Sequence, residues 1–343
     1  MSVAGKGRGG QVATRVVAAL ARLALLLLAV SLLAFVLVAA SPVDPVQANV
    51  GQAAWVSMSE AKRAQLAEHW GVGTPVLERY VAWLTAALQG DLGTSLRYNA
   101  PVADVLAWRA GNTLLLMSVA WVVSGVLGFL LGVLAGTRRD SRVDRAVKAY
   151  CFVIAATPTF WLGLVALMVF SVALGWFPVG FSVPIGKTAS DVTTIDVARH
   201  MVLPALTLSV TGVAQIALHT REKTVDVMEG DYVRFARARG LDTWQIVRHH
   251  VLRNVALPAI TLQFASIAEI FGGSVLVEQV FSYPGLGQAA VTAALGGDAA
   301  LLCAIAVVSA ALVFAGNAIA NLLYGIVDPR IGAGFKGAMG DGR

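Results

Sequence analysis

The stretch that decides the fold runs from residue 230 to residue 258 and reads GDYVRFARARGLDTWQIVRHHVLRNVALP. It is rich in Arg and His, yet strongly apolar stretches flank it on both sides. Asp231 can cap a first short helix, and Gly240 is typical of the left-handed residue that ends one. Asp242, followed three residues later by Gln245, has the spacing of a capping box. The stretch therefore predicts two short helices joined at a sharp corner.

The second of these helices carries an apolar stripe. Trp244, Val247 and Val251 follow one another at i, i+3 and i+7, which predicts one shared helical face. Such a face, surrounded by Arg and His, suits docking into a groove on another protein. The alternative is a solvated loop that only links two membrane spans. We favour docking, because the caps, the glycine corner and the stripe coincide.

The composition is that of a membrane protein. Apolar residues make up 57% of the 343 residues and charged residues only 13%, whereas about a quarter of an average soluble domain is charged. A helix of about 20 apolar residues crosses a hydrocarbon core of about 30 Å. The fold class that this predicts is all-α, a polytopic membrane protein with six transmembrane helices at Leu23–Ala40, Thr113–Ala135, Ala149–Leu174, Met201–Leu218, Val255–Val280 and Leu301–Ile326.

The basic residues predict how the chain is oriented. Of the 26 Lys and Arg residues, 19 lie in the N-terminus, in residues 137–148 and 219–254, and after residue 326, whereas 7 lie in the alternate loops. Cytoplasmic loops carry the excess of Lys and Arg in membrane proteins. Both termini and the corner are therefore predicted to be cytoplasmic, and the net charge of +6 requires no nucleic-acid partner.

Several residues inside the spans are candidates for function. Glu269 lies deep in a span, where an ionised carboxylate costs about 2.5–3.5 kcal/mol, so it either lines a pathway or pairs with a polar group on a neighbouring helix. Glu278 lies nearer the outer end of the same span and is a second candidate for lining a pathway. Pro158 should interrupt the third span and Gly272-Gly273 should weaken the fifth, which makes these positions candidate flexing sites.

The motifs that the sequence lacks exclude several functions. There is no G-x-x-x-x-G-K-[ST] phosphate loop, so ATP would have to be bound by another chain. The H-E-x-x-H and G-x-S-x-G motifs are absent, which argues against a membrane protease or lipase. The five histidines lack metal-ligand spacing. A membrane enzyme that uses Glu269 and a stand-alone channel are weaker alternatives, because neither explains a docking corner.

The corner resembles the EAA loop of permease subunits of ATP-binding-cassette importers, in the pattern of the dipeptide, oligopeptide and nickel permeases. Other stretches resemble the first of the two permeases and occur in the same order. They are YVAWL (80–84), GDLGTS (90–95), TPTFWLG (157–163), GWFP (175–178), HMVLPALT (200–207), GGSVLVEQVFSYPGLG (272–287) and DPRI (328–331).

The resemblance implies a type I importer permease fold and half of a translocation pathway for di- or oligopeptides, with nickel or another small solute as the alternative cargo. It implies as partners a homologous second permease, two cytoplasmic ATPases that bind ATP and Mg, an extracytoplasmic binding protein and membrane lipid, with no cofactor, metal or catalytic residue on this chain. The location implied is the plasma membrane of a bacterium or archaeon. The residues that it assigns to ATPase coupling are Asp231, Ala236, Gly240, Leu241, Asp242, Trp244, Val247 and Val251.

These predictions divide the chain into five segments. The extracytoplasmic segment, residues 41–111, is a helical subdomain that either packs on the spans or helps to receive the binding protein. Within the core, Gly128, Gly132 and Gly136 form a small-residue ridge for close helix packing. The segments are a cytoplasmic N-terminus (1–22), a first transmembrane helix (23–40), the outer subdomain (41–111), the permease core (112–327) with its coupling loop (219–254), and a cytoplasmic tail (328–343).

Overall fold

The computed structural model of the chain describes residues 6–70, 73–188 and 190–327. These residues are almost entirely helical, which confirms the all-α class. They divide into two compact units, the first made of the described residues up to 111 and of 288–314, and the second of the described residues in 112–287 and of 315–327. The predicted cytoplasmic tail and the DPRI stretch lie outside the described residues.

Six apolar spans are found in the described part of the chain when each of two bent helix pairs is counted as one broken span. Four spans are continuous helices, namely α1 (Lys6–Ala39), α6 (Val102–Thr137), α9 (Thr194–Glu229) and α15 (Ala299–Val327). The bent pairs are α7 (Arg142–Ala155) with α8 (Thr159–Ala166) and its π-helical continuation (Leu167–Ala173), and α12 (Leu252–Ala265) with α13 (Ile267–Val280).

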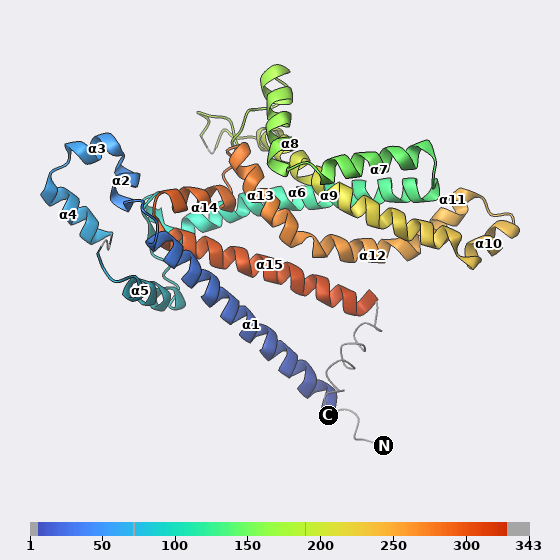
Figure 1. Ribbon diagram of the computed structural model, residues 1–343, viewed down its shortest axis with the longest axis horizontal. Helices are drawn as coiled ribbons and strands as arrows, with labels where there is room; N and C mark the ends of the chain where they lie inside the picture. Colours follow the sequence, from blue (N-terminus) through green and yellow to red (C-terminus); the bar gives the residue numbers. More distant parts are fainter. Residues whose placement is uncertain (1–5, 71–72, 189, 328–343) are drawn as a thin grey trace. The chain divides into compact units, whose positions relative to one another are not determined.

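The third span is not one straight helix. Its axis turns by 102° between α7 and α8, and Figure 1 shows α8 standing upright on the line of α7. Pro158 occupies the N-cap position of α8. A proline lacks the N–H that would continue the ladder and biases the preceding residue away from helical backbone. The prediction that Pro158 interrupts this span is confirmed, and the break is complete.

The fifth span bends at a residue that the sequence analysis does not select. The bend of 50° lies between α12 and α13, at Ser266, whereas Gly272 and Gly273 lie inside α13. Both glycines lie within a continuous helix in this conformation, and their role as flexing sites stays a prediction. A helical glycine costs only about 1 kcal/mol, which packing can offset. The Ser266 hydroxyl donates to the Gln263 carbonyl oxygen at 2.8 Å, and such bonds often bend helices.

The first unit contains the short helices of the outer subdomain. Tyr80 packs edge-on against Phe35 and shares a hydrogen bond of 2.9 Å with the Ser31 hydroxyl. Asp298 is buried and accepts a hydrogen bond from the Ser95 hydroxyl at 2.6 Å. The elements of the outer subdomain are α2 (Pro45–Val50), α3 (Gln52–Ser57), α4 (Glu60–His69), α5 (Val76–Leu88), and an antiparallel pair of two-residue strands, β1 (Thr94–Ser95) and β2 (Ala100–Pro101). The first unit also contains most of α14 (Leu286–Leu295), which begins in the second unit.

The second unit is organised around α9, which packs against α7, α8, α12 and α13. The predicted glycine ridge lies on the side of α6 that faces α9. A Cβ atom at Gly128 would lie 2.7 Å from Cβ of Ile216, and one at Gly132 would lie 2.5 Å from Cβ of Thr220. A Cβ atom at Gly136 would likewise lie 2.5 Å from Cβ of Thr224. Close helix packing, as predicted for this ridge, is confirmed.

Candidate functional site

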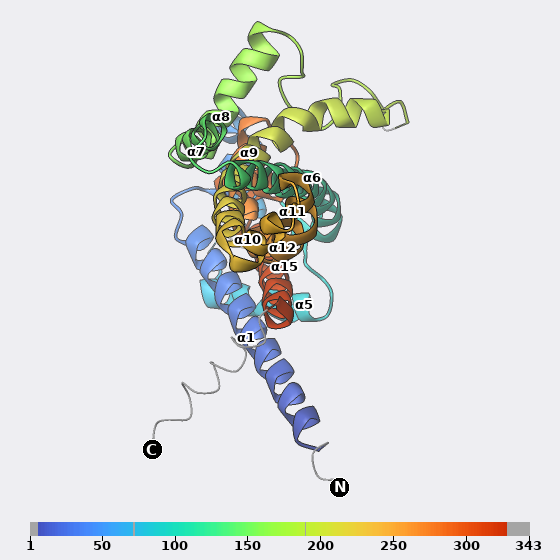
Figure 2. The ribbon, with the colours of Figure 1, turned by 90° about the vertical axis from the view of Figure 1, so that its right-hand side faces the viewer.

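Residues 230–258 fold as the predicted corner. α10 (Asp231–Ala238) follows α9 after one residue, and α11 (Thr243–Ile246) runs through a π-helical turn (Val247–Val251) into α12. Figure 1 shows α10 and α11 at the end of the long helices α9 and α12, and Figure 2 turns that end toward the viewer. Because the corner is continuous with both long helices, a displacement of the corner is transmitted to both.

Backbone geometry ends α10 where the sequence predicts. Gly240 has a φ of +84°, and its N–H donates to the Arg237 carbonyl at 2.9 Å. The N–H of Leu241 donates to the Ala236 carbonyl at 3.1 Å. These two bonds form a Schellman motif, which requires a left-handed residue and so favours glycine.

The two helix starts differ in how well they are predicted. Asp242 accepts a hydrogen bond from the Gln245 N–H at 2.7 Å, and the Gln245 side chain accepts one from the Asp242 N–H at 3.0 Å, which confirms the capping box. The prediction that Asp231 caps α10 is wrong. Gly230 occupies the N-cap with extended backbone, and Asp231 is the first helical residue, where its carboxylate lies 3.4 Å from Arg234.

The stripe of α11 does not form one docking face. Trp244 is 68% exposed, but Val247 and Val251 are buried in a cluster with Val233 and Ala236 of α10. Val247 and Val251 do share a side, but α10 covers it, whereas Trp244 in the first turn of α11 lies outside this cluster. Val247, Val251 and Ala236 therefore hold the corner together, and the partly buried Leu241 packs against the same cluster.

The exposed face of the corner is aromatic and basic. Phe235 is 72% exposed and Tyr232 is 44% exposed, and both come from α10, which the sequence analysis did not assign to docking. A sequence signal could have identified these two aromatics. Tyr232 and Phe235 are spaced at i and i+3, and each directly precedes a residue of the buried pair Val233 and Ala236. Large exposed aromatics mixed with Arg are typical of protein interfaces. The arginines on this face are Arg234, Arg237, Arg239 and Arg248.

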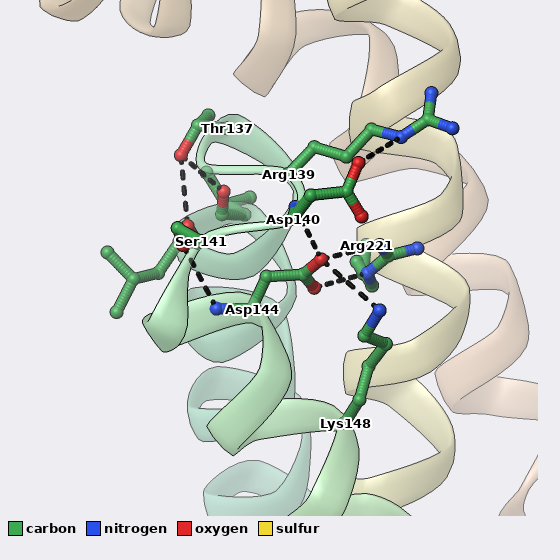
Figure 3. Close-up of polar contacts among 9 residues, drawn as sticks. Thr137, Arg139, Asp140, Ser141, Asp144, Lys148 and Arg221 are labelled. Atoms are coloured by element: carbon green, nitrogen blue, oxygen red, sulfur yellow. Dashed lines mark hydrogen bonds and ion pairs between the residues drawn. The ribbon is translucent and has the colours of Figure 1, made fainter.

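A buried ion pair fixes the helices beneath the corner (Figure 3). The fully buried Asp144 of α7 accepts two hydrogen bonds from the Arg221 guanidinium of α9, at 2.6 Å from Nε and 2.7 Å from Nη2. The backbone N–H of Asp140 donates to the same carboxylate at 2.9 Å, and Lys148 Nζ lies 3.5 Å away. The pair lies outside the predicted spans, which begin at Ala149 and end at Leu218. The Arg221 hydrogen bonds hold the pKa of the Asp144 carboxyl well below its usual range.

Glu278 is fully buried within the second unit. Its carboxylate accepts a hydrogen bond from the Thr113 hydroxyl at 2.7 Å, and that hydroxyl also accepts one from the Leu286 N–H at 2.7 Å. Gly285 lies against the carboxylate so closely that a Cβ atom there would overlap with it. In this conformation Glu278 therefore fixes the loop that follows α13, and its assignment to the translocation pathway stays a prediction.

Glu269 differs from the buried acids. It is exposed on α13 and borders a cavity of about 250 Å³ between α8, α9 and α13. Gly272 and Gly273 line the same cavity, and Pro158 immediately precedes its Thr159 wall. Within the described residues, no three His, Cys, Asp or Glu side chains come together in a way that could hold a metal ion.

Comparison with known proteins identifies relatives along most of the chain. Residues 128–333 match the family described as binding-protein-dependent transport system inner membrane component. The oligopeptide transport system permease protein AppB of Bacillus subtilis is 39% identical over 307 residues, which cover 89% of this chain and 95% of the relative. A peptide permease protein of Brucella suis is 36% identical with the same coverage. The di/tripeptide transport system permease protein DppB of Pseudomonas aeruginosa is 33% identical, over 88% of this chain and 94% of the relative.

Proposed function

Because the chain belongs to the family of binding-protein-dependent transport system inner membrane components, we propose that it is a permease subunit of an ATP-driven peptide importer. The relatives named as oligopeptide and di/tripeptide permeases match this chain over nearly their whole length. This supports peptides over nickel as the cargo. A homologous second permease supplies the other half of the solute path. Binding protein delivers the peptide from outside.

The corner couples the permease to the ATPase. The observation that carries this assignment is the corner, with its Schellman motif, its capping box and its exposed Phe235 and Trp244, placed at the shared end of α9 and α12. Two cytoplasmic ATPase subunits bind ATP and Mg, and this chain itself binds no cofactor and catalyses no reaction. The excess of Lys and Arg on the corner supports a cytoplasmic location for it and for both termini.

The mechanism is alternating access driven from the corner. ATP closes the two ATPases, which displaces the corner. Since α9 packs on α7, α8, α12 and α13, displacement of α9 moves these helices together as a packed group. The Asp144–Arg221 pair prevents α7 from sliding along α9 during that movement. The cavity between the permeases then opens to the outside, and ATP hydrolysis returns it to the inside.

Substitutions on the corner test this function. We expect Trp244→Ala and Phe235→Ala each to weaken co-purification of the ATPase by about tenfold, as loss of an interface aromatic does, while the permease stays in the membrane. Stimulation of ATP hydrolysis by loaded binding protein should fall in parallel. Trp176→Ala is the matched control, since Trp176 is 58% exposed but lies far along the chain from the corner. Full co-purification and full stimulation in both corner variants would rule out the coupling assignment.

The cargo is tested by uptake. The complete transporter with its binding protein, reconstituted in proteoliposomes, should accumulate radiolabelled tri-alanine when ATP is supplied. A parallel experiment with radiolabelled Ni²⁺ tests the alternative cargo. Accumulation of nickel without accumulation of the peptide would contradict the proposed function.

A further inference from the structure

The cavity beside Glu269 brings several polar side chains together among apolar ones, in the middle of apolar spans. It lies in the second unit, next to both helix breaks, because Thr159 starts α8 and Ser266 separates α12 from α13. Gly272 leaves one wall open, since a Cβ atom there would have no neighbour within 4 Å. The polar residues that line the cavity are Thr159, Thr211, Gln215, Ser266 and Glu269.

Three of these side chains have hydrogen-bonding groups without a partner. The hydroxyls of Thr211 and Ser266 donate to carbonyls of their own helices, at 3.0 Å and 2.8 Å. By contrast, the side chains of Thr159, Gln215 and Glu269 form no hydrogen bond or ion pair with any residue that the structure describes. Polar groups at membrane depth need a partner, so these three require water or a solute in the cavity.

Two buried acids of the second unit do not have such free capacity. Asp144 is bound by Arg221, and Glu278 is bound by Thr113. Glu269 therefore stands apart as a carboxylate that faces a cavity. An ionised carboxylate only accepts hydrogen bonds, whereas an ammonium group has three donors. The Gln215 amide oxygen and the Thr159 hydroxyl supply further acceptors around the same space.

We propose that this cavity is a binding site for a protonated primary amine, and that in transport it receives the N-terminal ammonium group of the passing peptide. The second half of the proposal rests on the proposed function. The cavity, at about 250 Å³, is smaller than pockets that enclose whole drug-sized ligands, which begin near ~300 Å³. It holds the amine end of the cargo, and the remaining peptide lies outside it.

Charge-selective labelling tests the site without peptide transport. In the complete transporter, Cys151 and Cys303 are replaced by Ala, and Thr211→Cys introduces one thiol into the cavity wall. Its reaction rates with aminoethyl methanethiosulfonate, which carries an ammonium group, and sulfonatoethyl methanethiosulfonate, which is anionic, are compared. We expect the ratio of the two rates to exceed that of a free thiol by about tenfold, because one nearby carboxylate attracts the cationic reagent and repels the anionic one in a partly hydrated site.

Two variants decide the outcome. Glu269→Gln should return the rate ratio to that of a free thiol. Glu222→Gln is the matched control, because Glu222 is exposed on α9 but does not line the cavity, and it should leave the ratio unchanged. A ratio that Glu269→Gln does not alter, or a thiol that reacts with neither reagent, would overturn the proposal.

Peptide uptake then connects the site to the cargo. Glu269→Gln should lower ATP-dependent uptake of tri-alanine by about fivefold or more, in keeping with the loss of a charge-assisted hydrogen bond, without changing the affinity of the binding protein. If the wild-type transporter takes up no peptide while the labelling ratio behaves as expected, the proposed peptide function fails and the amine site stands. If peptide uptake is normal in Glu269→Gln, the role of the site in transport is wrong.

Discussion

At the scale of single residues, the Asp144–Arg221 pair explains how α7 and α9 keep their register below the corner. The carboxylate is fully buried, and the Arg221 side chain is 18% exposed. Two parallel hydrogen bonds of an arginine fork fix both distance and orientation. Removing one partner of such a pair leaves the other charge without compensation in a poorly solvated place. Loss of the Asp144 charge should therefore lower the stability of the subunit, whereas loss of the charge of an exposed acid nearby should not.

Asp144→Asn should lower the free energy of unfolding by about 2–3 kcal/mol, below the usual cost for a fully buried pair because Arg221 reaches solvent. The measurement is denaturant unfolding of the detergent-solubilised subunit. Asp140→Asn is the control. The Asp140 carboxylate is 77% exposed, and its ion pair within the described residues is with Arg139. Equal stability of the two variants would contradict the assignment.

The pH dependence of this pair has a definite sign. Arg221 lowers the pKa of Asp144 in the folded protein, so the unfolded chain binds the proton first as the pH falls. The stabilisation is complete above the unfolded pKa, about 4, and is lost as the pH falls from there toward the lower folded value. The stability difference between wild type and Asp144→Asn should therefore shrink below about pH 4. A difference that stays constant down to about pH 2 would show that the carboxylate is not the titrating group.

At the scale of elements, helix ends and helix contacts follow from small residues in specific places. Gly240 allows the left-handed turn that ends α10, and the capping box at Asp242 starts α11 directly after it. Gly132 permits α6 to approach α9, because a Cβ atom there would lie 2.5 Å from Cβ of Thr220 and 2.7 Å from the Ala217 carbonyl oxygen. Thus one glycine is needed for its conformation and the other for its lack of a side chain.

Gly132→Ala should destabilise the subunit by about 1–3 kcal/mol, because the added methyl group forces α6 and α9 apart. Gly111→Ala in the same helix provides the comparison, since a Cβ atom there meets nothing within 4 Å. That variant should be neutral or slightly stabilising, because alanine favours helix over glycine by about 1 kcal/mol. The midpoints of denaturant unfolding distinguish the two variants. A Gly132→Ala subunit as stable as the Gly111→Ala subunit would refute close packing at the ridge.

At the scale of the whole molecule, six spans and an uneven charge distribution define a multi-pass membrane protein with one basic side. The 19 basic residues assigned to one side include every Arg of the corner. The proposed orientation rests on this distribution and on no single contact, because the excess of Lys and Arg in short loops determines which side stays in the cytoplasm. In the proposed topology the exposed positions Arg142 and Asp242 lie on the cytoplasmic side, and the exposed Lys62 and Lys187 lie on the other.

Thiol labelling measures this orientation. Single cysteines at Arg142 and Asp242, in a version without Cys151 and Cys303, should react with an impermeant maleimide only after the membrane is permeabilised. Cysteines at Lys62 and Lys187 should react in intact cells. All four side chains are exposed within their units, so lack of reaction reflects the membrane and not burial. The reverse pattern of reactivity would invert the proposed topology.

Local features of the corner and of the spans were predictable. Gly240, the Asp242–Gln245 box, the break at Pro158 and the glycine ridge depend on residues within a few positions of one another or on a simple helical repeat. The prediction of the docking stripe failed where a neighbouring helix decides the result, because Val247 and Val251 are buried against α10. The bend of the fifth span lies at Ser266, which the sequence analysis did not select.

The sequence by itself therefore determined the membrane class, the six spans, the corner and the family resemblance, because apolar length, charge distribution and helix caps are properties of short stretches of chain. The tertiary structure alone decided that Asp144 meets Arg221, 77 residues away, that Glu278 is satisfied by Thr113, and that Glu269 borders a cavity between α8, α9 and α13. These outcomes depend on which helices pack together. Packing brings distant side chains into contact, and no local period or cap encodes that pairing.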